Sequence, residues 1–385
     1  MITNNKSSQD KILCLTFNQD SSCFAIGTET GFKIYSLYPE KHCFERNLNG
    51  GIGIIEMLYK SNILGLVGGG TYPKFSKNKL IIWDDIQRKE IAELKFTSNV
   101  INIKLKKDRI FSICENKIFI FDFKTYKNIE IIQTSDNPKG LIGLSYEQNI
   151  NIIAYPISNN NNKDSQKGKL KIHDKEKNKD IGITAHENLI SYISMNKEGT
   201  ILASASEKGT IIRIFSCING GVLQEFKRGT EKAEINYISF DNLGILLGAT
   251  SDRRTIHIWS IINSIKKLNG KSDDDKKNNL NNINNNEISD INYDDFGKNK
   301  NNNIQNNLPE NKSSIFNIFG VKTERSFAKI KLGDEYLYKF AFLPNNYILA
   351  ISYFGKYIYA SLNDKRGEFC NIDESGFLSE TNFHK

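Results

Sequence analysis

The chain has 385 residues, of which 39% are hydrophobic and 25% charged, and its formal net charge is +8. This composition is ordinary for a soluble globular protein long enough to bury a large core. No stretch reaches the apolar length of a membrane-spanning helix, and the first residues lack the apolar region of a signal peptide. We therefore expect a cytoplasmic protein with only peripheral membrane contact. The positive charge suits a phosphate ligand, a membrane surface or a nucleic acid, but it equally suits a lysine-rich surface without a specific role.

Motifs for metal binding and catalysis are missing from the sequence. The six cysteines contain no Cys-x-x-Cys pair, and there are only five histidines, so we expect no metal site and no cofactor. No Gly-x-Ser-x-Gly elbow occurs. The glycine-rich run at residues 67 to 71 is not followed by Gly-Lys-Ser/Thr, so we interpret it as a tight bend between strands. We expect a protein that is not an enzyme.

A weak repeat with a period of roughly 40 to 45 residues runs through the chain. Each unit has an apolar strand, an Asn, Asp or Gly turn, a strand of small residues, a Gly-containing turn, and a strand with an aromatic residue near its end. The units cover residues 12–36, 54–83, 98–123, 141–173, 190–215, 235–259 and 336–360. About seven such units predict an all-β, seven-bladed β-propeller of the WD40 type, which we treat as one domain over residues 1–385.

Two segments interrupt the repeat. Residues 158–168 are polar and fit a loop inside the fourth unit. Residues 264–313 are dominated by Asn, Lys and Asp. They cannot bury enough apolar surface to offset their ordering entropy, so we predict a disordered insert within blade six. An apolar run follows the insert, and a strand is predicted at 326–332. We assign residues 365–385 to a C-terminal tail.

The sequence Leu-Gln-Glu-Phe-Lys-Arg-Gly-Thr-Glu-Lys at 223–232 places a basic pair, Lys227 and Arg228, after the fifth unit. In an extended chain, adjacent side chains point to opposite faces. The two residues would then serve two different pockets. Gly229 would allow a sharp turn or the close approach of a ligand, and we expect Phe226 to anchor the segment in the core. Taken alone, the segment favours a solvated basic turn between blades.

Two similar hairpins flank the basic pair, and both combine hydroxyl, imidazole and cationic groups, which are the donors that phosphate oxygens require. The upstream hairpin with its approach contributes His186, Ser204, Ser206, Lys208, Thr210 and Arg213. The downstream hairpin contributes Ser251, Arg253, Arg254, Thr255 and His257. Serine and threonine are common in turns without any ligand, but the paired arrangement favours two anion pockets.

These residues carry a family resemblance. The run Glu-Phe-Lys-Arg-Gly-Thr resembles the Phe-Arg-Arg-Gly signature of the PROPPIN (WIPI-type) propellers. Further similar runs spread over most of the chain. They are Gly-Phe-Lys-Ile-Tyr at 31–35, Glu-Met-Leu-Tyr at 56–59, Leu-Val-Gly-Gly-Gly at 66–70, Ile-Ile-Trp-Asp-Asp at 81–85, Ser-Ala-Ser-Glu-Lys-Gly-Thr-Ile-Ile-Arg-Ile-Phe at 204–215 and Arg-Ser-Phe-Ala-Lys at 325–329.

The resemblance implies an autophagy effector that binds phosphatidylinositol 3-phosphate or phosphatidylinositol 3,5-bisphosphate at two rim sites. Lys227 and Arg228 would serve one site each, and the two sites would be lined by the upstream set and by Ser251, Arg253, Thr255 and His257. A long blade-six loop would enter the bilayer. Its candidate wedge residues are Ile315, Phe316, Ile318 and Phe319, which could instead pack on the propeller. The implied partner is a lipid-transfer or conjugation-machinery protein of autophagy, and we expect a monomer on autophagosomal, endosomal or vacuolar membranes. The Asn-rich, Lys-rich insert is typical of plastid-bearing parasites and also points to plastid-associated vesicles.

Two positions depart from the family pattern. Lys227 replaces an arginine, so charge is kept but two-pronged geometry is lost, and we expect a weaker or less selective site. Arg254 stands where the family has glycine. It could contact phosphate, block its pocket or point outward.

The competing hypothesis is a WD-type scaffold that binds only proteins, through loops such as residues 71–78. Nucleic-acid binding is not expected, because the basic residues are not interleaved with a stacking platform. If His186 and His257 line phosphate pockets, binding should strengthen as the pH falls through about 6.5.

Overall fold

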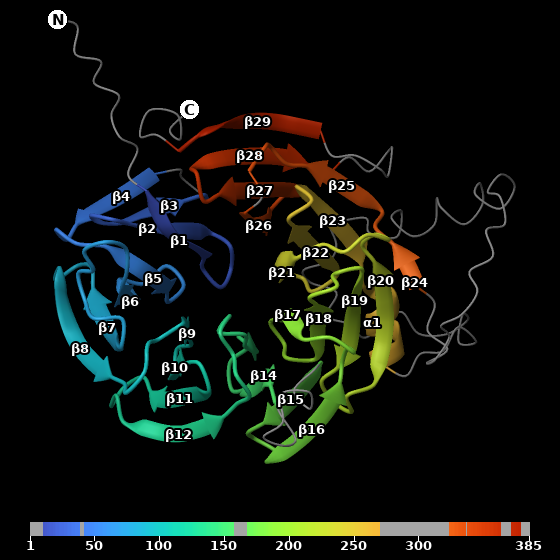
Figure 1. The fold of residues 1–385 in the computed structure, drawn as a ribbon, viewed down its shortest axis with the longest axis horizontal. Helices are drawn as coiled ribbons and strands as arrows, with labels where there is room; N and C mark the ends of the chain where they lie inside the picture. Colours follow the sequence, from blue (N-terminus) through green and yellow to red (C-terminus); the bar gives the residue numbers. More distant parts are fainter. Residues whose placement is uncertain are drawn as a thin grey trace, which may run out of the picture.

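The computed structural model describes residues 11–38, 42–157, 168–269, 323–335, 337–362 and 371–378. Its strands form seven separate sheets that are arranged radially around a central axis (Figure 1). The predicted seven-bladed propeller is therefore confirmed. Within the described ranges, no helix is long and apolar enough to cross a membrane.

The first three blades are meanders in which consecutive strands pair antiparallel. Blade one contains β1 (Ile12–Phe17), β2 (Cys23–Thr28), β3 (Gly31–Ser36) and β4 (His42–Asn47). Blade two contains β5 (Ile52–Met57), β6 (Ile63–Gly68), β7 (Lys79–Asp84) and β8 (Lys89–Lys95). Blade three contains β9 (Asn102–Leu105), β10 (Arg109–Ile113), β11 (Lys117–Asp122) and β12 (Asn128–Gln133).

Blades four to seven follow the same plan, with one addition. Blade four contains β13 (Gly143–Leu144), β14 (Ile152–Pro156), β15 (Lys169–Asp174) and β16 (Lys179–Thr184). Blade five contains β17 (Ile190–Met195), β18 (Ile201–Ser206), β19 (Ile211–Ser216), β20 (Val222–Lys227) and the added β24 (Thr323–Arg325). Blade six contains β21 (Ile235–Phe240), β22 (Leu246–Ser251), β23 (Thr255–Ser260) and β25 (Ala328–Lys331). Blade seven contains β26 (Tyr338–Leu343), β27 (Tyr347–Ser352), β28 (Lys356–Ser361) and β29 (Asn371–Phe377).

The turn between the first two strands of a blade is held by a polar side chain that accepts backbone N–H groups. In blade one, Asn18 Oδ1 accepts from the N–H of Cys23 at 3.0 Å. In blade five, Asn196 Oδ1 accepts from the N–H of Ile201 at 2.8 Å. Blade six uses Asp241, whose carboxylate is buried, and burial raises its pKa to about 6. The predicted Asn and Asp turns therefore have a physical role, because each one fixes the register of its hairpin.

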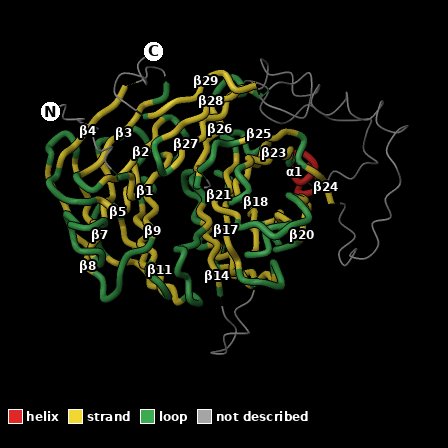
Figure 2. Tube along the Cα trace, turned by 45° about the horizontal axis from the view of Figure 1, so that its top comes forward, coloured by secondary structure: helices red, strands yellow, loops and turns green. Residues whose placement is uncertain are grey.

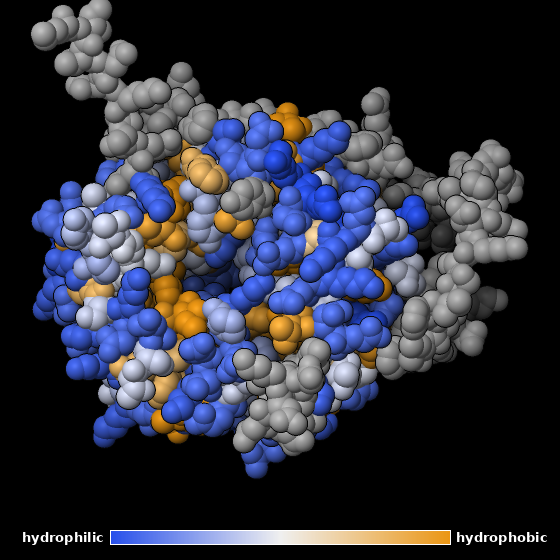
Figure 3. Space-filling view, viewed as in Figure 1, coloured by the Kyte–Doolittle hydropathy of each residue, from blue (hydrophilic) through white to orange (hydrophobic). Residues whose placement is uncertain are grey.

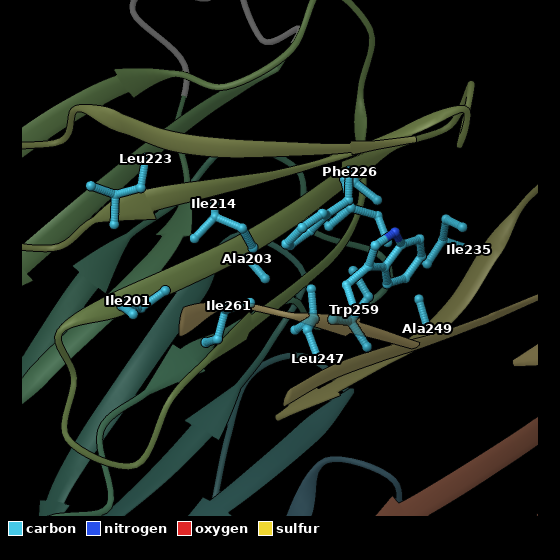
Figure 4. Close-up of a cluster of buried hydrophobic side chains, with 13 residues drawn as sticks. Ile201, Ala203, Ile214, Leu223, Phe226, Ile235, Leu247, Ala249, Trp259 and Ile261 are labelled. Carbon is cyan, nitrogen blue, oxygen red and sulfur yellow. The ribbon is translucent and has the colours of Figure 1, made fainter. Parts of the chain in front are cut away.

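The core lies between neighbouring blades. Between blades five and six, Phe226 and Trp259 stack with ring centroids 5.4 Å apart (Figure 4). Aliphatic side chains from both blades surround the two rings. Phe226 is fully buried, so the prediction that it anchors the basic segment is confirmed. Burying such a ring contributes about 1.5–3 kcal/mol relative to exposing it.

The blade-six insertion is anchored at both ends on the outer edge of blade five. After β23, the helix α1 (Ile262–Leu268) packs on β20, and Lys267 Nζ donates to the carbonyl of Leu223 at 2.7 Å. The chain returns as β24, which pairs parallel with β20 (Figures 1 and 2). The prediction of disorder from residue 264 is wrong for residues 264–268, which form most of this helix.

Two further expectations change in the C-terminal region. Residues 371–377 were assigned to a tail, but they form β29, the outer strand of blade seven. This strand lacks a run of apolar residues, because an outer strand has one edge and much of its surface in solvent. The strand expected at 326–332 is shorter and spans Ala328–Lys331. The polar segment at 158–168 separates β14 from β15, as expected, and residues 158–167 lie outside the described part of the chain.

Candidate anion-binding site

Blade five is the wall between two candidate pockets. The strand register places Ser204 beside Arg213 and Arg213 beside Glu225, so these side chains share one face. This face looks toward the connection from blade four, where Arg213 Nη1 donates to the carbonyl of Ala185 at 2.7 Å. Phe226, the next residue of β20, lies on the other face and packs in the core shared with blade six. The end of the interface between blades four and five that carries Lys227 is named the first pocket, and the end of the interface between blades five and six that carries Arg228 is named the second pocket.

The two basic residues separate across this wall. Lys227 follows Phe226, so it shares the face of Glu225 and belongs to the first pocket. Arg228 lies on the side of the second pocket, where its charge helps to lower the pKa of His257. The alternation inferred from the sequence thus describes the geometry of this hinge.

His186 lies at the base of the first pocket. Its Nε2 is 2.9 Å from Ser204 Oγ, and both residues are buried. Burial, together with the nearby charge of Arg213, lowers the pKa of His186 to about 3. Gly168 supports this position with φ +67°, and a Cβ there would come within 1.6 Å of the carbonyl oxygen of His186. The imidazole is therefore neutral at physiological pH and is held in a fixed place.

Arg213 is already committed to protein partners. Its Nε donates to Glu225 Oε1 at 2.7 Å, and its Nη1 donates to the carbonyl of Ala185. Thr323 on β24 also donates to Glu225, at 3.5 Å. Arg213 therefore orders the wall of the first pocket, and a large share of its hydrogen-bonding capacity is used there.

The remaining upstream residues lie around the turn between β18 and β19. Ser206 is buried, whereas Lys208 is exposed and Thr210 is partly buried. The carbonyl of Thr210 accepts from the N–H of Arg228 at 2.9 Å. Gly209 completes the turn with φ +59°, and a Cβ on it would lie 1.8 Å from the carbonyl oxygen of Ala233. The structure thus brings the predicted upstream set and the basic pair to the same end of blade five.

The second pocket has its own buried imidazole. His257 Nδ1 is 3.1 Å from Ser326 Oγ, and its ring stacks on Trp259 with centroids 5.6 Å apart. Burial, then the charges of Lys329 and Arg228, lowers the pKa of His257 to about 4. Lys329 lies directly beside His257 in the pairing of β23 with β25.

Arg228 spans the mouth of the second pocket. Its Nε donates to the carbonyl of Gly209 at 2.8 Å, and its Nη2 donates to the carbonyl of Glu231. Burial lowers the pKa of this guanidinium, although the carboxylate of Asp252 partly opposes that effect. The bonds to the two carbonyls hold the side chain in an extended position beside the loop that follows β20.

Arg253 is held by the same loop. Its guanidinium forms an ion pair with Glu231 at 3.2 Å and donates to the carbonyl of Lys232 at 3.2 Å. Ser251 Oγ accepts from the backbone N–H of Arg253 at 3.3 Å, which closes the turn. Thr255 Oγ1 donates to the carbonyl of Arg253 at 3.3 Å. The residues of the downstream set therefore lie close together, and the carboxylate of Glu231 neutralises the charge of Arg253.

The sequence left more than one possible role open for both Arg254 and Gly229. Arg254 has φ +57°, the left-handed conformation that glycine adopts without strain. Its guanidinium reaches Asp334 at 3.5 Å, in the connection toward blade seven, so it points outward. Gly229 is not among the residues with positive φ, and a Cβ on it would meet nothing within 4 Å. These observations do not exclude a turn at Gly229, and the open space around its α-carbon fits the alternative expectation, the close approach of a ligand.

The burial of the two imidazoles does not favour the pH dependence expected for binding, which stays a prediction. Both imidazoles are buried, and their pKa values lie at about 3 and about 4. Neither group titrates near pH 6.5, so a fall of pH through that value does not charge them. The burial that produces these shifts could not be deduced from the residue pattern.

Some contributors were missed and others cannot be placed. Glu225, Glu231, Ser326 and Lys329 contact the predicted residues but were not assigned to the site. Ser326 precedes the strand β25 and Lys329 lies within it. Their neighbour His257 precedes the long insert, so local sequence patterns do not bring these residues together. The candidate wedge residues Ile315, Phe316, Ile318 and Phe319 lie outside the described residues.

The surface seen in Figure 3 is mostly hydrophilic, including the part that overlies blades five and six, and it is hollowed at the centre. In the described part of the chain, no group of three or more His, Cys, Asp and Glu residues could hold a metal ion. The polar groups that converge beside blade five are hydroxyls, neutral imidazoles and cations. Such a set can donate several hydrogen bonds to one anion.

Comparisons with known proteins agree with this arrangement. A profile of the PROPPIN family matches residues 11–273. The SVP1-like protein 2 of Debaryomyces hansenii is 37% identical over 293 residues, covering 68% of this chain and 68% of that protein. The autophagy-related protein 18 of Yarrowia lipolytica is 35% identical over 268 residues, covering 66% of this chain and 67% of that protein.

Solved structures share the architecture. The structure of Kluyveromyces lactis Hsv2 with its complete loop 6CD has a TM-score of 0.70 at 21% identity, and the match covers 96% of this chain and 100% of that one. The complex of KlAtg21 with the coiled-coil of AgAtg16 gives a TM-score of 0.68 at 21% identity, with 96% and 100% covered. At this level of identity, the similarity concerns the fold alone.

Proposed function

The chain belongs to the PROPPIN family of β-propellers, and on this premise we propose that it is a peripheral membrane effector of autophagy-type processes. It binds phosphatidylinositol 3-phosphate or phosphatidylinositol 3,5-bisphosphate, one headgroup in each pocket beside blade five. The observation that carries the proposal is the position of Lys227 and Arg228 on opposite faces of one strand end. Lys227 lies at the first pocket and Arg228 at the second, and each pocket contains a buried histidine and hydroxyl groups.

The chemistry of the pockets fits a phosphomonoester. Cations give it the charge-assisted bonds that are stronger than neutral ones, and serine and threonine hydroxyls supply further donors. Two pockets on one rim act bivalently on a membrane. Their joint affinity can exceed that of either pocket by 10² to 10⁴, so each pocket can be weak alone.

The biological setting follows from the relatives. One of them is named an autophagy-related protein, and a structural neighbour was solved with a coiled-coil partner. We propose that this chain likewise recruits a protein of the lipid-transfer or conjugation machinery to autophagosomal, endosomal or vacuolar membranes. It would act as a binding scaffold without catalytic turnover.

The experiment is co-sedimentation with liposomes that carry phosphatidylinositol 3-phosphate. We expect the double variant K227T/R228T to lose binding while its thermal unfolding stays close to that of the unaltered chain. The matched control is K89T/K95T, which removes two exposed lysines from β8 of blade two. It should bind as the unaltered chain does. If K227T/R228T still sediments with these liposomes, the proposal fails and a scaffold that binds only proteins is favoured.

A further inference from the structure

The first pocket has a neighbour that the propeller repeat does not supply. Blade five carries a fifth strand, β24, which pairs parallel with the outer strand β20. The register aligns Glu225 with Thr323 and Lys227 with Arg325. Because paired residues of adjacent strands point to the same face, Arg325 lies on the face of Lys227. Figure 1 shows β24 on the outer edge of blade five, next to the end of β20.

This alignment places two cations side by side. Adjacent strands lie about 4.8 Å apart, and like charges directly opposite one another are destabilising. The acidic neighbour on this face, Glu225, is already engaged by Arg213 at 2.7 Å and by Thr323 at 3.5 Å. Among the described residues, no carboxylate forms an ion pair with Lys227 or Arg325. Three cations therefore face one carboxylate, and the excess charge lies at the open end of the pocket.

An anion between Lys227 and Arg325 would relieve this repulsion. Lysine offers a compact charge, and arginine offers two parallel N–H donors that match the oxygens of a phosphate. Lys227 at the end of β20 brings a charge but no guanidinium. Arg325 brings one from the next strand, on the same face.

We propose that Arg325 is a phosphate-binding residue of the first pocket, so that this pocket is complete only when β24 is paired with β20. This inference rests on the proposed function. It adds the strand β24 to the elements that form the first pocket. The ligand chemistry is a phosphomonoester dianion, which a lipid headgroup or a free phosphate compound could provide.

The test is a double-mutant cycle read by titration calorimetry with soluble inositol 1,3-bisphosphate, the headgroup of the 3-phosphorylated lipid. R325Q should weaken one of the two binding events roughly tenfold, as expected for a lost hydrogen bond to a charged group. R325K, which keeps the charge, should recover part of the loss. K95Q removes an equally exposed charge from blade two and should bind as the unaltered chain does.

The cycle separates the two pockets. R325Q and K227Q should be non-additive because both act on one phosphate, whereas R325Q and R228Q should be additive. Equal binding by R325Q and K95Q, or additivity with K227Q, overturns the inference and leaves the proposed function intact. No binding by the unaltered chain overturns both. If inorganic phosphate shows the same loss in R325Q while liposomes are not bound, the residue assignment stands and the lipid source is excluded.

Discussion

The two pockets beside blade five share their ingredients but differ in how their cations are held. In the first pocket, Arg213 is locked to Glu225 inside the wall, and Lys227 forms no ion pair with a described carboxylate. In the second pocket, Arg228 and Arg253 both bind the loop after β20, the former through carbonyls and the latter through Glu231. Under the proposed function, an anion would enter the first pocket without breaking an ion pair of Lys227, whereas in the second pocket it would compete with the loop contacts of Arg228 and Arg253. Fewer contacts to break lower the free-energy cost of binding. The first pocket can therefore bind an anion as tightly as the second, although Lys227 lacks the two parallel donors of an arginine.

The largest effect is expected from a substitution in blade five, which borders both pockets. Phe226 is fully buried against Trp259 and lies between the two basic residues and the core. Phe226→Ala should lower the free energy of unfolding by about 3–5 kcal/mol, as for other buried aromatic truncations. Both pockets should then lose affinity together, which removes the difference between them. Chemical denaturation measures the loss. A change below about 1 kcal/mol would contradict the role of this ring as the anchor.

The two histidines make stability depend on pH. Each has a folded-state pKa below the unfolded value of about 6.5, at about 3 for His186 and about 4 for His257. The unfolded chain therefore binds more protons as the pH falls. The stability is fully present above pH 6.5 and is lost as the pH approaches the folded values. Between pH 7 and pH 5, each should account for about 2 kcal/mol of lost stability.

His186→Gln and His257→Gln should each flatten this pH profile, measured by denaturant unfolding at several pH values. His173→Gln, which changes an imidazole that binds Asp180 on blade four, is the matched control. Below pH 4 the profile of His186→Gln should still differ from that of the unaltered chain, because the pKa of His186 is the lower of the two. Profiles that stay parallel in both variants would exclude the burial account of these side chains.

Arg254 tests whether the second pocket carries backbone strain. A left-handed residue other than glycine is strained by about 1 kcal/mol. Arg254→Gly should therefore raise the melting temperature by about 1 °C and leave headgroup affinity unchanged, because the side chain points to Asp334. Arg88→Gly, at φ +52° in blade two, should stabilise the protein similarly. A loss of affinity in Arg254→Gly would show that this guanidinium reaches the ligand.

The smallest effect is expected from a substitution of Glu231. It tests directly whether the ion pair of Arg253 makes the second pocket differ from the first. Glu231→Gln should free Arg253 and tighten headgroup binding roughly two- to fivefold, because exposed ion pairs contribute only about 0.2–1 kcal/mol. Glu234→Gln is the matched control, since Glu234 lies in the same loop as Glu231 but pairs with Lys139, in the connection between blades three and four. Calorimetry should show a gain for Glu231→Gln alone. Equal gains in both variants would mean that net charge, and not release of Arg253, determines the affinity.

Local sequence features predicted most of the fold because they act within one hairpin. The Asn and Asp turns, the small residues of the second strand and the terminal aromatic residues each specify contacts a few positions apart. The added strand β24 and the position of β25 could not be predicted in this way, because they pair across the long insert. β29 was missed because its residues, Asn371–Phe377, have no apolar pattern.

In the candidate site too, features set by local sequence could be predicted, and features set by contacts between distant segments could not. The position of Lys227 and Arg228 on two faces follows from strand alternation, which is a local rule. The partners that hold Arg213, Arg253 and Arg254 come from other strands and loops, so neither their ion pairs nor the burial of the histidines could be deduced. Tertiary context therefore decides which cations are available to an anion.

If blade five separates two pockets, each with its own cation, the number of inositol 1,3-bisphosphate molecules bound per chain should reveal both. Titration calorimetry measures this number. We expect two for the unaltered chain, one for K227T, one for R228T and none for the double variant. A single bound molecule in the unaltered chain that either substitution abolishes would contradict this separation, because both residues would then serve one site.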